Sequence, residues 1–290
     1  MIYDVRQTTT CLYATPVSRA RHVLRLTPVS RDGERVQVAA LQIVPEPAHR
    51  REGQDFFGNR LTWIEVDTPH ETLTIKLSAR VSLDAAPMPQ QTPPWEDVRE
   101  GAFATNDIGP LSPAHFLFPS RMISLDPEIR DYVRQSFPAG RSVLDAGLEL
   151  IGRIKNDMVY EIGATTVTTT PPMSFALRRG VCQDFAHIMI SGLRGIGLPA
   201  AYVSGYLRTT PRGEAPRLQG ADAMHAWVML WCGAEAGWIG LDPTNGVPAQ
   251  EDHVVLAIGR DYTDVAPLDG VIFGSGRQRI AVAVNVIPVN

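Results

Sequence analysis

The stretch LRRGVCQDFA, residues 177–186, decides how the second half of the chain folds. Gly180 permits a tight turn, and apolar side chains then recur at helical spacing until Gly-Leu-Pro at residues 197–199. They are Phe185, Ile188, Met189, Leu193 and Ile196. Cys182 is therefore predicted in the first turn of a helix, where the helix dipole favours an anion. Because the thiolate is the nucleophilic form of cysteine, Cys182 is our candidate nucleophile; the alternative is a small residue buried at a helix start.

A second pattern predicts a β-hairpin that carries a histidine and an aspartate. Residues 224–231, MHAWVMLW, have the length and apolar bias of a strand, and residues 238–242, WIGLD, follow a glycine-containing turn. If the tryptophan that ends the first strand faces the one that begins the second, His225 is a diagonal same-face neighbour of Asp242. Such neighbours have Cα atoms about 7–8 Å apart. A register slip of one residue would place the two side chains on opposite faces.

The expected chemistry of that pair is base catalysis. A carboxylate on one ring nitrogen of His225 fixes the tautomer and stabilises the imidazolium, which leaves the other nitrogen for a thiol. Taken singly, His225 fits a packed strand residue, and Asp242 fits a turn former before Pro243. Together with Cys182, each lies on the type of element that its role requires. We therefore predict a catalytic triad of Cys182, His225 and Asp242.

The other reactive side chains have less distinctive contexts. Cys11 follows a threonine run near a predicted strand, and Cys232 ends a strand beside a glycine turn. His187 lies five residues beyond Cys182, and because successive helical residues turn by about 100°, it leaves the face of the cysteine. All three are expected to be structural.

The first part of the chain shows no helical period. Apolar and polar residues alternate in short runs between turn residues, which predicts an antiparallel β-sandwich. The runs are Tyr3–Arg6, His22–Leu26, Val36–Val44, Arg60–Val66, Thr72–Ser78 and Arg80–Leu83. The alternative is a few strands that flank one mixed domain.

The chain is expected to have three parts and an α+β fold. Residues 1–85 form the sandwich-like β-domain, and residues 86–120 form a linker, because their prolines oppose a continuous helix or sheet. Residues 121–290 form a core in which the cysteine-bearing helix packs on an antiparallel sheet with the histidine and aspartate, followed by a C-terminal β extension. Asp126-Pro127 and Ser142 are predicted to begin two of the core helices.

Composition limits the partners of the protein. The 290 residues carry a net charge of -4 with a pI near 6.0 and show no basic stripe, so no nucleic-acid partner is expected. We see neither a secretory signal nor a run of about 20 apolar residues, so we expect a cytoplasmic protein without a membrane partner. Three cysteines without CxxC spacing argue against a disulfide framework and a zinc site. No cofactor or metal is expected.

These motifs resemble the transglutaminase-like superfamily, in particular bacterial proteins that join a transglutaminase-like N-terminal β-domain to a transglutaminase-like cysteine-peptidase core. The core motifs are Arg179–His187, Gly197–Tyr206, His225–Val228 and Gly237–Asn245. Residues 55–59 resemble part of the family's β-domain, and residues 259–267 resemble its C-terminal extension. Nearly the whole chain is covered, most loosely in the proline-rich middle.

The resemblance implies a role for each residue of the triad. Cys182 is implied as the nucleophile, His225 as base and then acid, and Asp242 as the orienting group. The backbone amide of Cys182 is the expected oxyanion donor because it lies at a helix start. Gln183 and Tyr160 are weaker candidates for a second donor.

We expect a thiol enzyme that hydrolyses a peptide or isopeptide bond through a thioester acyl-enzyme, with a peptide or protein as substrate. The alternative within the same chemistry is transfer of the glutamine acyl group to an amine. No dense acidic loop resembles a calcium site, which disfavours a calcium-activated crosslinker. A catalytically idle peptide-binding scaffold is an alternative of another class, against which the intact triad argues. A mononuclear Cys-His-Asp metal site is disfavoured by the wide ligand spacing.

Overall fold

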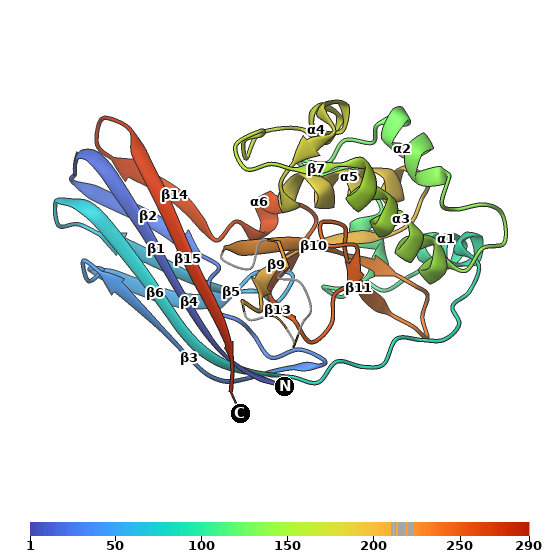
Figure 1. The fold of residues 1–290 in the computed structure, drawn as a ribbon. Coiled ribbons are helices and arrows are strands. Elements are labelled where there is room, and N and C mark those ends of the chain that lie inside the picture. The colour runs from blue at the N-terminus through green and yellow to red at the C-terminus, as the bar shows by residue number, and fades with distance from the viewer. Residues whose placement is uncertain (210, 212, 214–217, 220–222, 290) are drawn as a thin grey trace.

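The computed structural model describes residues 1–209, 211, 213, 218–219 and 223–289 (Figure 1). Two antiparallel sheets form a β-sandwich at one side of the molecule. In one sheet the strand order is β15 (Gln278–Pro288), β1 (Ile2–Val17), β6 (His70–Leu83) and β3 (Glu34–Val44). In the other it is β14 (Leu268–Phe273), β2 (Arg19–Leu24), β5 (Arg60–Val66) and β4 (His49–Gln54). Every second residue of β1 from Tyr3 to Tyr13 is buried, which is the alternation expected of a strand with one face on a core.

The end of the chain returns to the sandwich. We expected residues 121–290 to form the core with its own C-terminal β extension, but β15 pairs with β1 from Tyr3 to Tyr13, and β14 pairs with β2. Without these partners β1 and β2 would be edge strands with unpaired backbone groups, so the C-terminal segment satisfies them. The N- and C-termini consequently lie close together (Figure 1).

Two details of the sandwich differ from the sequence pattern. The runs at residues 72–78 and 80–83 belong to one strand, β6, whose alternation of buried residues continues from Leu73 to Leu83. Strand β4 was not predicted because its sequence, HRREGQ, has no apolar residue to alternate. It is a solvent-exposed edge strand that pairs only with β5 among the described strands.

The second half is built around a five-stranded antiparallel sheet. Its order is β12 (Val247–Pro248), β11 (Trp238–Asp242), β10 (Met224–Trp231), β9 (Ala200–Leu207) and β13 (His253–Gly259). Trp231 faces Trp238 across the β10–β11 hairpin, so the predicted register is confirmed. The chain is thus an α+β protein with antiparallel sheets.

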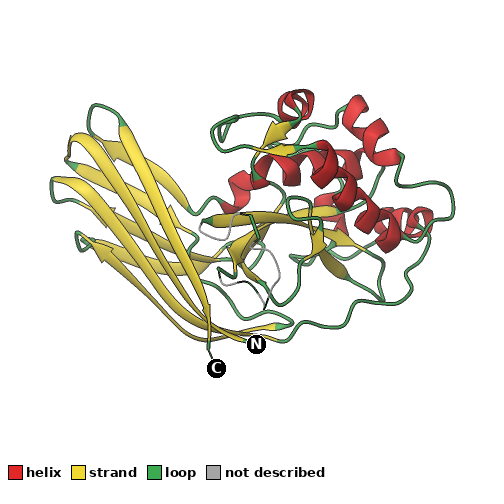
Figure 2. Ribbon diagram, in the orientation of Figure 1, coloured by secondary structure: helices red, strands yellow, loops and turns green. Residues whose placement is uncertain are grey.

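Helices cover one face of this central sheet (Figure 2). They are α1 (Trp95–Phe103), α2 (Pro127–Arg134), α3 (Val143–Asp157), α4 (Pro171–Leu177), α5 (Cys182–Gly195) and the short α6 (Tyr262–Val265). The 3-10 turn η1 (Pro113–Phe116) lies on the opposite face, where Phe116 packs against Trp227 of β10. Ala226, Val228 and Leu230 of β10 belong to the apolar core shared with these helices. None of the helices in the described ranges has the length and apolar character needed to cross a bilayer.

The expected helix starts are confirmed at Asp126 and Ser142, whose side chains accept backbone N–H groups as N-caps of α2 and α3. Helix α1 was not predicted, because the prolines of residues 86–120 were taken to oppose a helix, and α4 was missed because Pro171-Pro172 was interpreted in the same way. Instead, Pro94 precedes α1, and Pro171 begins α4 at a position where the missing N–H costs nothing. The residues expected to form a linker therefore contain a helix whose Trp95 is buried in the core.

The sandwich packs against the β9–β13 side of the central sheet. Tyr206 of β9 and Val254 and Leu256 of β13 are buried in the apolar core of the sandwich. The hydroxyl of Tyr206 donates to Gln7 Oε1 of β1 at 2.6 Å. The central sheet therefore lies between the helices and the sandwich (Figure 1).

Candidate active site

Cys182 is the first residue of α5 and is partly exposed. Asp184 caps this helix start: its Oδ2 accepts the backbone N–H of Val181 at 2.8 Å, and its own N–H donates to the Val181 carbonyl at 2.9 Å. Gly180 makes room for that carboxylate, because a Cβ there would lie 2.6 Å from Asp184 Oδ2. As a first-turn residue, Cys182 has a backbone N–H without an intrahelical partner, so the N–H is available to an oxyanion.

A threonine-rich loop is fastened to the same helix start. Thr165 donates its hydroxyl to Asp184 Oδ2 at 2.6 Å, and Gln183 donates Nε2 to the carbonyl of Val167 at 3.2 Å. Asp184 and Gln183 therefore hold the helix start and the loop together. The Gln183 side chain is directed at Val167, which weakens its case as an oxyanion donor.

The hairpin brings His225 and Asp242 into contact. His225 Nε2 lies 2.9 Å from Asp242 Oδ2, and the side chains of both residues have no solvent exposure. The contact follows from the confirmed β10–β11 register, which makes the two residues diagonal neighbours on one face.

The charges of this pair are strongly coupled. Burial disfavours the imidazolium of His225, but the charges of Asp242 and Cys182 outweigh burial and raise the pKa of His225 to about 10. Burial also disfavours the carboxylate of Asp242, yet His225 and His253 hold its pKa well below the ordinary value. Near neutral pH the pair is therefore an imidazolium and a carboxylate.

Nδ1 of His225 is the ring nitrogen left for the thiol. It is buried and makes no hydrogen bond of ordinary geometry among the described residues, but the Cys182 thiol is close enough to act on the imidazole as a hydrogen-bond partner. Cys182 is among the groups that raise the pKa of the ring, so the thiol and the imidazole are electrostatically coupled. Because Nε2 faces Asp242, the charged donor that remains for the candidate nucleophile is Nδ1–H.

The two oxygens of Asp242 have different tasks. Oδ1 accepts the backbone N–H groups of Thr244 at 2.9 Å and Asn245 at 3.2 Å, which closes the turn after β11. Oδ2 faces the histidines and also accepts Asn245 Nδ2 at 2.7 Å. The turn-forming and imidazole-orienting interpretations of Asp242 are thus both supported by its contacts.

Tyr160 stands beside the nucleophile through a short parallel pairing. Strand β7 (Val159–Tyr160) pairs with β8 (Arg179–Gly180) so that Tyr160 faces Gly180, two residues before Cys182. Burial raises the pKa of Tyr160 to about 12, and the charges of Cys182 and Asp242 act in the same direction. Its hydroxyl is therefore a neutral donor close to the candidate nucleophile.

His253 is a residue of this site that the local sequence pattern did not predict. Its Nε2 lies 3.1 Å from Asp242 Oδ2, and its side chain is 3% exposed. The available signal was its position immediately before the apolar run at residues 254–258. Its partner lies on a strand that is not adjacent in the sheet, so no local pattern indicated the contact.

The remaining candidates have the surroundings of structural residues. Cys11 and Cys232 are 1% and 0% exposed, and burial raises the pKa of both thiols, that of Cys232 to about 12. His187 is buried and its Nε2 accepts the backbone N–H of Tyr262 at 3.3 Å. All three cysteines are free thiols, and only Cys182 is partly exposed.

One group among the described residues has the composition of a metal site. The ligand atoms of His225, Asp242 and His253 lie within 4.8 Å of one another. Both imidazoles, however, use their Nε2 protons to bind Asp242 Oδ2, and a metal would have to displace both protons. The contacts account for all three residues as a hydrogen-bonded set.

Comparisons with known proteins agree with this architecture. Residues 3–82 match the family model of the bacterial transglutaminase-like N-terminal region, and residues 131–243 match that of the transglutaminase-like superfamily. An uncharacterized protein of Mycobacterium tuberculosis is 36% identical over 99% of this chain and 92% of its own length. A protein-glutamine gamma-glutamyltransferase of Pseudomonas aeruginosa is 30% identical over 48% of this chain and 22% of its own length.

The fold has a solved counterpart. The crystal structure of a candidate cysteine protease from Cytophaga hutchinsonii superposes with a TM-score of 0.76 and 23% sequence identity, covering 100% of this chain and 92% of that one. At this identity the likeness concerns the fold. The relatives and the two family models together show that the chain belongs to the transglutaminase-like superfamily.

Proposed function

We propose that the protein is a thiol hydrolase that cleaves a peptide or isopeptide bond through a thioester on Cys182. The observation that carries the proposal is the buried His225–Asp242 pair, 2.9 Å apart, electrostatically coupled to the partly exposed thiol at the start of α5. Each member has the environment that its role requires: a nucleophile at the positive end of a helix, a charged imidazole and a fixed carboxylate.

The acylation step follows from these positions. The thiolate of Cys182 attacks the carbonyl carbon of the scissile amide, and the carbonyl oxygen becomes an oxyanion that accepts the backbone N–H of Cys182. Nδ1–H of His225 then protonates the leaving amine as the C–N bond breaks. The products of this step are a thioester on Cys182, a free amine and a neutral His225.

Deacylation reverses the proton transfer. Nδ1 of neutral His225 removes a proton from water, and the hydroxide attacks the thioester carbonyl. The C–S bond breaks, which releases the carboxylic acid and restores the thiolate and the imidazolium. Asp242 keeps Nε2 of His225 protonated throughout, so that Nδ1 remains the reacting nitrogen.

A second candidate differs only in the group that resolves the thioester. The Pseudomonas aeruginosa relative is a protein-glutamine gamma-glutamyltransferase. Its name supports a second candidate reaction in which a primary amine, and not water, attacks the thioester. In that reaction Nδ1 of His225 would take the proton of the attacking amine, and an amide would form on the former glutamine acyl group.

A mass-spectrometric screen tests the proposal. Wild type, Cys182→Ala and the matched control Cys232→Ala are incubated with peptide, isopeptide and glutamine-peptide pools, with and without a labelled primary amine. We expect hydrolysis products from wild type and Cys232→Ala, none from Cys182→Ala, and an acylated Cys182 peptide after acid quenching. Amine-labelled product in excess of hydrolysis product would establish the second candidate.

Two outcomes contradict the proposal. Turnover by Cys182→Ala would remove the cysteine from the mechanism. The absence of any acyl adduct across the panel, with substrate peptides still bound to Cys182→Ala, would instead support an idle peptide-binding scaffold.

A further inference from the structure

We propose that His253 is a positioning residue that fixes Asp242, and that the β-sandwich holds His253 in place through β13. The proposal rests on the proposed function of Cys182, His225 and Asp242. It gives the sandwich a task in the catalytic site, although none of its residues belongs to the predicted triad.

His253 meets Asp242 in a fixed orientation. It is the first residue of β13, where it pairs with Leu207 of β9, and its Nε2 reaches Asp242 Oδ2 at 3.1 Å. The ring of Trp227 lies edge-on to His253 at 5.1 Å and stacks with His225 at 6.2 Å. One indole therefore contacts both imidazoles and restrains the planes of the two rings.

The backbone permits this close packing. A Cβ at Gly205 of β9 would lie 2.4 Å from the ring of Trp227 and 2.2 Å from the carbonyl oxygen of Val254. Only glycine leaves room for the indole to lie against β9 between the two histidines. Gly205 is thus part of the arrangement that presents His253 to Asp242.

The shared oxygen determines the tautomers. Oδ2 of Asp242 is an anionic acceptor, so His225 and His253 must both donate from Nε2. With Asn245 Nδ2 as a third donor, Oδ2 is held from three directions. A carboxylate held in this way cannot rotate away from His225, and its proton affinity stays low because every donor favours the charged form.

The free edge of β13 is bound by the sandwich. Because β13 is the outermost strand of the central sheet, its outer backbone groups need partners from elsewhere. Glu34 Oε2 accepts the N–H of Val255 at 2.8 Å. Asn59 accepts the N–H of Ile258 at 2.8 Å and donates to its carbonyl at 2.7 Å.

Both sandwich residues are themselves fixed. Asp55 accepts Nδ2 of Asn59 at 2.9 Å, and Arg31 donates to Asn59 Oδ1 at 2.8 Å. Glu34 is 5% exposed, and burial raises its pKa to about 8, so its carboxyl group is mostly neutral at pH 7. Glutamine is therefore a close mimic of Glu34 that keeps the acceptor for Val255.

A pair of substitutions separates the hydrogen bond of His253 from its packing. Gln places its amide nitrogen near the position of Nε2 and keeps a donor, whereas Phe keeps the ring and removes the donor. We expect His253→Phe to lower kcat, and the rate of Cys182 alkylation by iodoacetamide at neutral pH, by about 10-fold or more, which is typical for a lost bond to a charged group. KM should not change because His253 is buried, and His253→Gln should stay close to wild type.

Two patterns would overturn the role of His253. If His253→Gln and His253→Phe lower the alkylation rate equally, or if neither lowers it, the hydrogen bond donated to Asp242 does not determine the reactivity of Cys182. The alkylation rate needs no substrate, so the result stands even if the proposed hydrolase activity is not found.

A measurement on the wild type avoids any folding problem of the variants. Protein labelled with ¹⁵N-histidine should show that Nε2 carries a proton in both His225 and His253 near neutral pH. An Nδ1–H tautomer of His253 would contradict the proposal directly.

The task of the sandwich is tested by a double-mutant cycle. Glu34→Met keeps the size of the side chain but removes the acceptor for Val255, and Glu34→Gln is the matched control. We expect Glu34→Met alone to lower the rate of Cys182 alkylation severalfold. Added to His253→Phe, it should cause no further loss, because both changes release the same contact. Asn59→Ala serves as a second variant with the same expectation.

Independent effects of the two substitutions would refute the role of the sandwich. If the losses of Glu34→Met and His253→Phe multiply in the double variant, the sandwich does not act through His253. Asp4→Asn, which removes a sandwich ion pair to Arg80 remote from β13, should leave the alkylation rate unchanged.

Discussion

His187 and His225 are both buried near an aspartate, but only His225 has the electrostatic surroundings expected of a catalytic base. His187 follows Cys182 by five residues on α5, and burial lowers its pKa to about 4. His225 is equally buried, yet the charges of Asp242 and Cys182 overcome burial and raise its pKa to about 10. Burial and proximity in sequence to Cys182 therefore do not identify the candidate base.

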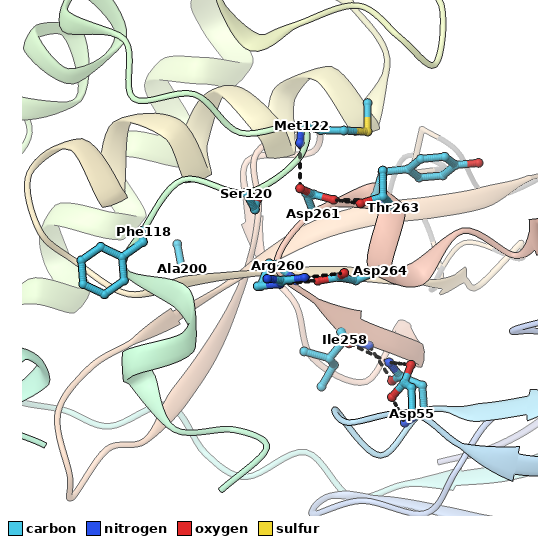
Figure 3. A network of polar contacts seen from close by, with 12 residues as sticks. Asp55, Phe118, Ser120, Met122, Ala200, Ile258, Arg260, Asp261, Thr263 and Asp264 are labelled. Carbon is cyan, nitrogen blue, oxygen red and sulfur yellow. Dashed lines mark hydrogen bonds and ion pairs between the residues drawn. The ribbon is translucent and has the colours of Figure 1, made fainter. Parts of the chain in front are cut away.

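The difference lies in where each carboxylate is bound. Asp261, the aspartate near His187, accepts the backbone N–H groups of Met122 at 2.8 Å and Thr263 at 2.9 Å (Figure 3). It joins the loop before α2 to α6. Asp242 accepts backbone N–H groups with Oδ1 alone, and its Oδ2 accepts side-chain donors, among them Nε2 of His225. To orient an imidazole, a carboxylate needs one oxygen that accepts no backbone N–H.

The largest expected effect comes from exchanging these two carboxylates for amides. Asp242→Asn should lower kcat by about 10³- to 10⁴-fold, because the amide no longer fixes the tautomer of His225. Asp261→Asn is the matched control and should change kcat only slightly while lowering the unfolding temperature. Steady-state kinetics on the substrate found in the peptide screen measure both; a larger kinetic loss in Asp261→Asn would reverse the assignment.

The two histidines should also give stability slopes of opposite sign. The pKa of His187 is about 4 in the folded state, below its ordinary value of 6.5, so folding stability falls as pH drops from about 6.5 towards 4. The pKa of His225 is about 10, so its contribution is fully present below about pH 6.5 and is lost as pH rises to about 10. Each contribution is at most roughly 3–5 kcal/mol, from about 1.4 kcal/mol for each pH unit.

Thermal unfolding across pH measures these slopes. His187→Gln, which keeps an acceptor for the Tyr262 N–H, should flatten the acid side of the profile, and His225→Gln should flatten the alkaline side. If the two variants change the same side, the charge states assigned to the histidines are wrong.

A smaller effect is expected at the tyrosine beside the nucleophile. Tyr160→Phe should lower kcat by about 10- to 100-fold if its neutral hydroxyl is the second oxyanion donor, as expected for a lost bond to a charged group. Tyr262 of α6 stands on the His187 side, and Tyr262→Phe should leave kcat within a fewfold of wild type. Similar losses in both variants would mean that neither hydroxyl has a specific task.

The smallest expected effect is that of metal removal. Because His225 and His253 both donate their Nε2 protons to Asp242, we expect the three residues to keep their arrangement without a bound metal. Dialysis against EDTA should leave the activity and the unfolding temperature unchanged. A loss that zinc restores would instead identify the group as a metal site.

Local patterns in the sequence were sufficient for much of the site. The start of α5 at Cys182 followed from a glycine turn and helical spacing, and the β10–β11 register followed from matching the two tryptophans. Both features depend on neighbours in sequence or on one short hairpin. The contact between His225 and Asp242 was predictable for that reason.

Features that depend on distant segments were not predictable in this way. His253 reaches Asp242 from β13, which β9 and β10 separate from β11 in the sheet. The pairing of β15 with β1 joins the two ends of the chain, and the strands alone do not indicate which edge they complete.

Helices α1 and α4 were missed because proline has opposite effects at a helix start and in a helix interior.

The central claim is that Cys182 forms an ion pair with a His225 that Asp242 keeps charged. The most direct measurement is the rate of iodoacetamide labelling across pH, resolved by cysteine, in wild type and His225→Ala. We predict that Cys182 alone is alkylated rapidly below pH 7 in wild type, and that His225→Ala abolishes this reaction. Labelling of Cys182 no faster than that of buried Cys11 or Cys232, or unchanged labelling in His225→Ala, would contradict the claim.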